Sequence, residues 1–195
     1  LTPLLVILLS NFFFLNNLEA QNRAALQKAN EAKLTYPLYK GSVEMGVMPV
    51  DNVTYPYTHK GVTKIAIDIS SPTPDSARGK FSSGIVEAMR ILNLHAAAGV
   101  PKENMDVVLV FHGPGSTGFL NDEQYNNRFK MNNPNLQLIK QMQDNGVKLV
   151  VCGQTVAYRN YTTEYYVTGT LKAYSARTAI SDLTQRGYAV YTISE

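Results

Sequence analysis

The stretch that decides the fold is VKLVVCG, residues 147–153. Its apolar run, 147–151, is typical of a buried strand in a parallel sheet. Cys152 follows the run directly, and open α/β sheets hold their ligands just past the carboxyl ends of such strands. Cys152 is the only cysteine of the chain, so it cannot form an intrachain disulfide. We therefore expect it to act as a nucleophile, a carrier or an interchain partner, or else to be a small buried hydrophobe.

Outward from this stretch, strands and helices alternate along the chain. Apolar runs predict strands at 64–69, 105–111 and 188–193, and a short one at 170–174. Helical spacing predicts helices at 83–98, 121–130, 133–144 and between Ser175 and Gly187. Such alternation is typical of an α/β domain whose parallel sheet is covered by helices on both faces.

Each predicted helix begins at a residue suited to that position. Ser82 or Ser83 is the expected cap of the first helix, Asn121 of the second and Ser175 of the last. Pro134 is the expected first residue of the third helix, where its missing N–H costs nothing.

The amino-terminal part of the chain differs in composition from the rest. Residues 1–20 contain the apolar runs 4–9 and 12–15, which predict a secretory signal peptide cleaved after Ala20. The alternative is an N-terminal anchor that is never cleaved. We therefore expect a periplasmic or secreted protein with an N-terminal extension at 21–61 and one domain at 62–195. Within the extension, 21–33 suits a short helix, and the Pro and Gly residues of 36–59 exclude a long one.

Charge and ligand spacing narrow the classes of function. The net charge of +3 is too small for a nucleic-acid platform, so we expect no nucleic-acid partner. With one cysteine and no histidine pair at ligand spacing, we expect no metal site, and no motif calls for a cofactor.

His112 ends one predicted strand as Cys152 ends another. If these strands are parallel neighbours, both side chains reach the same edge of the sheet. His112 could then take the thiol proton or bind an anionic substrate. The alternative is a histidine that hydrogen-bonds its own loop.

Three further features at this edge are candidate ligand-binding groups. Backbone N–H groups of the loop 112–118, around Gly113 and Gly115, could cradle an anion beside those at Gly153. The alternative for this loop is a flexible turn, since it lacks the P-loop pattern. Arg159 could hold an anion near the thiol, and the alternative is a solvated surface arginine.

Three segments together carry a family resemblance. They are VVLVFHG (107–113), VKLVVCGQT (147–155) and QRGYAV (185–190), in that order. The chain from about residue 62 to its end resembles the DsrE/DsrF-like family, which includes sulfur-relay subunits. The resemblance implies a three-layer α/β/α domain of flavodoxin-like architecture with a parallel sheet of about five strands.

The resemblance also carries functional expectations. It implies a homo-oligomer, a trimer or a hexamer. It implies that Cys152 carries a persulfide and exchanges sulfur with a donor or acceptor protein. Many family members have no established activity, so a non-enzymatic module that binds a small anion or nucleotide remains the alternative. A third reading is an envelope assembly protein that contacts partners through its Tyr-rich segment 36–58.

Overall fold

The structure is a computed structural model and describes residues 20–71 and 79–194. The proposed signal peptide lies, apart from Ala20, outside the described residues, so its cleavage stays a prediction. No helix in the described ranges combines the length and apolarity needed to cross a membrane.

The domain is built on one sheet of five parallel strands in the order β4-β3-β2-β1-β5. The strands are β1 (Thr63–Ile69), β2 (Met105–Phe111), β3 (Lys148–Cys152), β4 (Leu171–Ala173) and β5 (Ala189–Ile193). The predicted parallel sheet is thus confirmed, with Cys152 as the last residue of β3 rather than the first residue after it.

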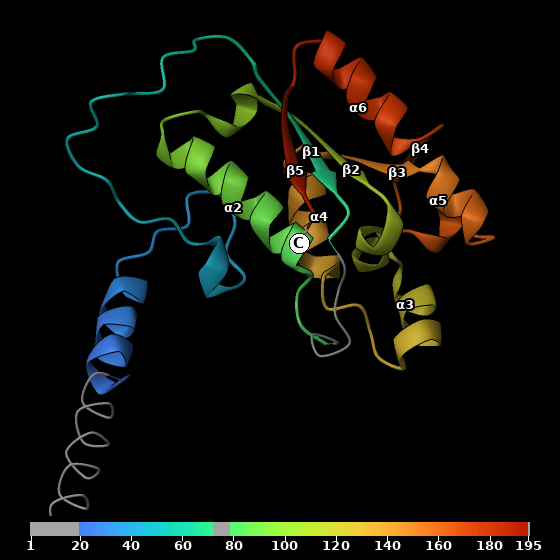
Figure 1. Cartoon of the computed structure of the whole chain (residues 1–195), viewed down its shortest axis with the longest axis horizontal. Helices are drawn as coiled ribbons and strands as arrows, with labels where there is room; N and C mark the ends of the chain where they lie inside the picture. The colour runs from blue at the N-terminus through green and yellow to red at the C-terminus, as the bar shows by residue number, and fades with distance from the viewer. Residues whose placement is uncertain (1–19, 72–78, 195) are drawn as a thin grey trace, which may run out of the picture.

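Helices cover both faces of this sheet. They are α2 (Ser83–Ala97), α3 (Asp122–Phe129), α4 (Leu136–Asp144), α5 (Gly153–Tyr158) and α6 (Ala176–Gln185). Figure 1 shows the strands between α2 on one side and α6 on the other. The chain steps from β1 to β4 in one direction and then returns to the far side of β1. Because such crossovers are right-handed, α6 must cross the face opposite to α2.

The sheet separates two apolar clusters. The larger packs one face of the sheet against α2 and α4, with Ile67, Leu109 and Leu149 among its buried strand residues. The smaller lies under α6, where Val108, Val110 and Cys152 pack with Ala176 and Leu183 of the helix. The alternation of side chains along each strand sends successive residues to the two clusters in turn. Cys152 therefore faces α6.

All three predicted caps stand at helix starts, and two of them make the capping bond. Asn121 accepts a hydrogen bond from the Gln124 amide, and Ser175 forms a capping box with Thr178. Ser82 precedes α2 as expected, but its side chain makes no capping bond.

Helix α4 begins at Leu136, after Pro134 rather than at it. The buried amides of Asn133 and Asn135 account for this start. Asn133 donates to the Gly118 and Leu120 carbonyls, and Asn135 accepts from the Ser82 amide. These bonds tie the approach to α4 to two other segments.

The Gly-rich loop folds as a turn of 3-10 helix, and its predicted anion-binding role stays a prediction. Residues Gly113–Phe119 form the 3-10 helix η4, in which 115–119 are buried. Gly115 explains the tight packing, because a Cβ there would stand 2.8 Å from the Ile69 carbonyl oxygen. Because the nearest atoms belong to the backbone, they cannot rotate away to make room for a side chain at residue 115.

The N-terminal extension packs against α2. Residues 20–31 are helical, as predicted, and an isolated antiparallel bridge joins Thr35 to Val47. The short 3-10 helix η1 (Val43–Met45) lies inside this loop. Asn93 of α2 holds the loop through its buried amide. Residues 35–47 of the extension are therefore packed against α2 as part of the fold.

A polar network closes the amino-terminal edge of the sheet. Tyr188 donates a hydrogen bond to Asp106, and Lys148 Nζ lies 2.9 Å from the same carboxylate. Burial and the hydrogen bond to Asp106 raise the pKa of Tyr188 to about 12.

This network predicts a loss of stability in strong base. An unfolded tyrosine releases its proton near pH 10, whereas native Tyr188 retains it until about pH 12. The native state therefore binds more protons in this window, and stability falls as the pH rises through it. We expect Tyr188→Phe to lose about 1 kcal/mol at neutral pH and to lower this slope. Urea unfolding of both proteins at the two ends of this pH window measures the slope. An unchanged slope would contradict the assignment.

Candidate functional site

Three neighbouring strands bring chemically active side chains to one corner of the sheet. β2 pairs with β3 in a register that matches Val110 with Val150 and Phe111 with Val151. The next residues of the two strands are His112 and Cys152. Because His112 alternates with Val108 and Val110, its side chain lies on the α6 face, as that of Cys152 does. The predicted meeting of these two residues at the carboxyl edge follows from this register.

The third strand contributes Asp68, which the sequence analysis did not single out. Asp68 lies on β1, opposite Val110, and alternates with Ala66 on the α6 face. Its Oδ1 atom stands 3.1 Å from Nε2 of His112, with 21% of the Asp68 side chain and 31% of the His112 side chain exposed. Asp68, His112 and Cys152 thus follow one another across β1, β2 and β3.

The Cys152 thiol is nearly buried, with 5% of the residue exposed. It packs among the apolar residues under α6, and α5 begins at the next residue, Gly153. Tyr166 is also close: burial raises its pKa, and the charge of a Cys152 thiolate would act in the same direction. The thiol is therefore held in an apolar setting at the carboxyl end of β3.

Helix α5 is fastened to the Gly-rich 3-10 helix. Thr155 accepts a hydrogen bond from the Gly113 amide at 3.0 Å. Arg159 donates to the Gly113 carbonyl at 2.9 Å and to Ser116 Oγ at 3.1 Å. These bonds join the segment that follows His112 to the segment that follows Cys152. They hold these two segments together at the carboxyl edge of the sheet.

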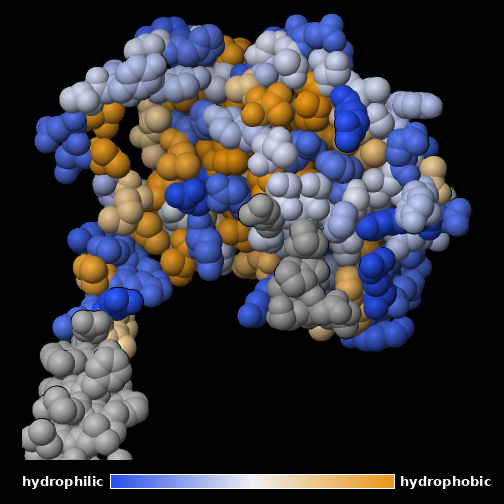
Figure 2. Space-filling view, viewed as in Figure 1, coloured by the Kyte–Doolittle hydropathy of each residue, from blue (hydrophilic) through white to orange (hydrophobic). Residues whose placement is uncertain are grey.

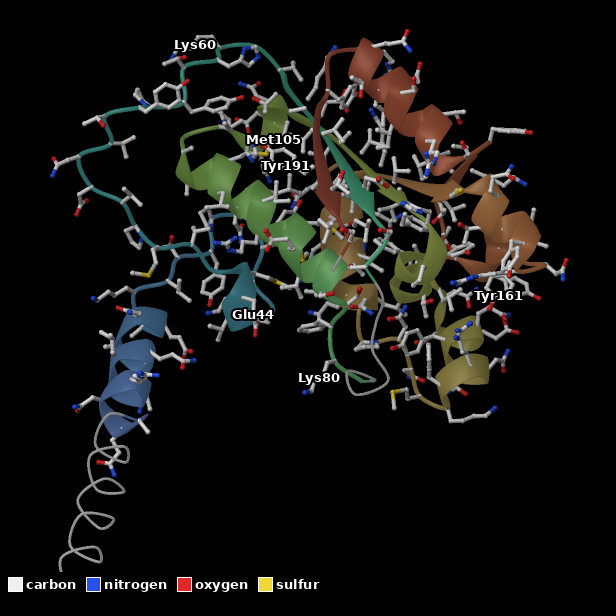
Figure 3. The ribbon with its side chains drawn as sticks, in the orientation of Figure 1. Glu44, Lys60, Lys80, Met105, Tyr161 and Tyr191 are labelled. Atoms are coloured by element: carbon white, nitrogen blue, oxygen red, sulfur yellow. The ribbon has the colours of Figure 1, made fainter. Side chains whose placement is uncertain are left out.

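Arg159 is neither a solvated surface residue nor a free cation. Its guanidinium also lies 3.4 Å from Thr117 Oγ1 and over the ring of Tyr161, at 6.0 Å from the ring centroid. Tyr161 is labelled in Figure 3, beside α5. An anion at this edge would have to compete with the loop for Arg159. The predicted anion-binding role of Arg159 remains a prediction.

The three glycines of the predicted site differ in what they allow. Gly113 has a φ of +49° with open space around it, which suits the turn out of β2. Gly115 is pressed against β1. Gly153 is pressed against the chain that follows β4, since a Cβ there would stand 2.6 Å from the Ala173 carbonyl oxygen. Gly115 and Gly153 thus serve close packing first.

Two large hollows of the described surface lie away from this corner. One hollow of about 590 Å³ is lined by the first turns of α2 and by the end of β5. Glu44 and Lys80, both labelled in Figure 3, also line it. Another of about 600 Å³ lies between α2 and the extension and is lined mainly by apolar residues such as Val50 and Val53. Figure 2 shows apolar side chains gathered on this side. Neither hollow is lined by Cys152 or His112.

Metal ligands do not gather at this corner. Within 20–71 and 79–194, no group of three or more His, Cys, Asp or Glu side chains is placed to hold a metal ion. The side chains that β1, β2 and β3 bring to this corner are a carboxylate, an imidazole and a thiol.

The comparisons with known proteins concern the same sheet. Residues 63–193 match the family model described as the DsrE/DsrF-like family. A solved structure of a protein of unknown function, MTH1491 from Methanobacterium thermoautotrophicum, is similar with 14% sequence identity and a TM-score of 0.49. That alignment covers 67% of this chain and 99% of the other. No curated protein matches the chain. The family match begins at the first residue of β1 and ends at the last residue of β5.

Proposed function

Because this chain belongs to the DsrE/DsrF-like family, we propose that Cys152 accepts a sulfane sulfur and carries it as a persulfide. The observation that supports this most is the register of β2 and β3, which sets His112 next to Cys152 on one face of the sheet. A nucleophile beside a base is the arrangement that activates a thiol.

The proposed step needs no external oxidant or reductant. His112 takes the proton of the Cys152 thiol, and the thiolate attacks the outer sulfur of a donor persulfide, R–S–SH. The new bond joins Cys152 Sγ to that sulfur, and the S–S bond of the donor breaks. The leaving thiolate, RS⁻, receives the proton from His112. Donor and carrier have then exchanged one sulfur atom.

The first experiment measures the mass of the intact protein after incubation with a low-molecular-weight persulfide. We expect the wild-type protein to gain the mass of one sulfur atom, and reduction with a thiol to remove it. Cys152→Ser should gain none. Equal addition of sulfur to wild type and Cys152→Ser, or no addition to wild type, would contradict the proposal.

A second candidate function is a non-enzymatic module that binds a small anion or nucleotide. The burial of Cys152 at 5% exposure among apolar neighbours favours it, because a packed thiol is a common structural residue. In this case Cys152→Ala keeps the function. A thermal-shift screen with phosphate, sulfate and nucleotides should then show a stabilising ligand, equally for wild type and Cys152→Ala. A screen without any stabilising ligand rejects this candidate.

Assembly and location are part of the same proposal. We propose a homo-oligomer, a trimer or a hexamer, that exchanges sulfur with a partner protein outside the cytoplasm. The edge strand β5 supports an assembly, since Val190 and Tyr191 are 39% and 36% exposed there. Light scattering of the purified protein measures the mass of the assembly.

A further inference from the structure

We propose that Asp68 is a positioning residue that fixes the ring of His112 for proton transfer with Cys152. The inference rests on the proposed function of Cys152. It adds a residue from a third strand to the pair that the sequence indicated. It also assigns different tasks to the two nitrogens of His112.

A carboxylate is an unexpected residue at this point of the sheet. The neighbouring positions on the same face are Ala66 on β1 and Val108 and Val110 on β2, all buried under α6. The Oδ1 atom of Asp68 is itself inaccessible and accepts no well-aligned hydrogen bond within the described ranges. Keeping a charged oxygen in such a place is costly unless an opposite charge compensates it.

His112 is the group placed to compensate this charge. Its Nε2 atom lies 3.1 Å from Oδ1 of Asp68, which is within ion-pair distance although the N–H is not aimed directly at the oxygen. The guanidinium of Arg159, which lies against the Gly-rich segment, bonds to Gly113 and Ser116 instead. The pairing of Asp68 with His112 is thus specific to these two side chains.

The contact determines which nitrogen of His112 is available. The carboxylate near Nε2 favours a proton on that nitrogen, and in this proposal the lone pair of neutral His112 is therefore on Nδ1. Nδ1 forms no hydrogen bond within 20–71 and 79–194, and in the proposed step it accepts the proton of the Cys152 thiol. When it does, the carboxylate stabilises the resulting imidazolium. A carboxylate that fixes the tautomer of a base and supports its charged form serves as the third member of a nucleophile–base–carboxylate set.

The test uses Asp68→Asn, which keeps the size of the side chain and removes its charge. The first readout is the rate at which Cys152 takes up sulfur from a low-molecular-weight persulfide. We expect Asp68→Asn to be slower by about tenfold or more. Asp144→Asn is the matched control, because Asp144 is exposed on α4 and pairs with Lys140 on the same helix. The control should react at the wild-type rate, and equal rates in all three proteins would overturn the proposal.

The second readout is independent of sulfur transfer. In ¹⁵N NMR spectra of histidine-labelled protein, the His112 signals are identified by their loss in His112→Gln. We expect the Nε2–H tautomer in wild type and Asp144→Asn, and a change toward the Nδ1–H form in Asp68→Asn. An unaltered tautomer in Asp68→Asn overturns the positioning role. If wild type accepts no sulfur yet the tautomer changes, the proposed function fails while the Asp68–His112 pairing stands.

Discussion

Replacing Asn93 with leucine is expected to cost the protein about 3–5 kcal/mol of unfolding free energy. Asn93 is fully buried in α2, and its amide makes four hydrogen bonds to the backbone of the extension. Its Oδ1 accepts from the Leu38 and Tyr39 amides, and its Nδ2 donates to the Tyr39 and Met45 carbonyls. Leucine fills a similar volume but leaves all four backbone groups without a partner.

The loss should be concentrated in the extension. Urea unfolding gives the total change, and hydrogen exchange shows where it arises. We expect faster exchange at 38–46 with little change in β2 and β3. Asn127→Leu is the control, since Asn127 is exposed on α3 and its substitution should change stability by less than about 0.5 kcal/mol. If Asn93→Leu unfolds like the control, the extension does not depend on this amide.

Replacing Gly153 with alanine is expected to cost about 2–4 kcal/mol and to displace the carboxyl end of β3. The new Cβ would stand 2.6 Å from the Ala173 carbonyl oxygen and 3.0 Å from that of Tyr174. Both are backbone atoms, so relief requires β4 and β3 to move apart. Because Gly153 directly follows Cys152, the same movement opens the apolar packing around the thiol.

Two measurements check this second prediction. Unfolding in denaturant gives the loss of stability, and the rate of alkylation of Cys152 by a maleimide reports access to the thiol. We expect alkylation to become faster as stability falls. Gly61→Ala is the control, because a Cβ there meets only the movable ring of His59. If Gly153→Ala keeps the wild-type stability and alkylation rate, β4 can move aside without loss of unfolding free energy, which contradicts the prediction.

Much of the fold was predictable because each strand and helix has a local pattern. The apolar run 105–111 has the bounds of β2, and Asn121 and Ser175 mark helix starts through bonds to their own backbone. Such signals act over a few residues, so the sequence displays them directly. The reading failed where distant segments compete, as at Pro134, whose neighbours Asn133 and Asn135 bond to other segments instead of starting a helix.

Part of the candidate site was predictable for the same reason. Cys152 and His112 stand where two apolar strands end, and parallel strands bring such ends together. Asp68 gave no such signal, since it lies inside its strand, between Ile67 and Ile69. Arg159 was a candidate anion ligand or a surface residue, yet Arg159 and Thr155 both bond to the Gly-rich segment forty or more positions away.

The sequence by itself determined that the chain forms a parallel α/β sheet and that Cys152 ends one of its strands. Periodicity, capping residues and breakers suffice for that, because they act between near neighbours. Only the tertiary structure decided that β1 lies beside β2, which sets Asp68 3.1 Å from His112. The same holds for the attachment of the extension to Asn93. Strand order and side-chain pairing join residues far apart in the chain, and the free energy of such contacts depends on the whole packed fold.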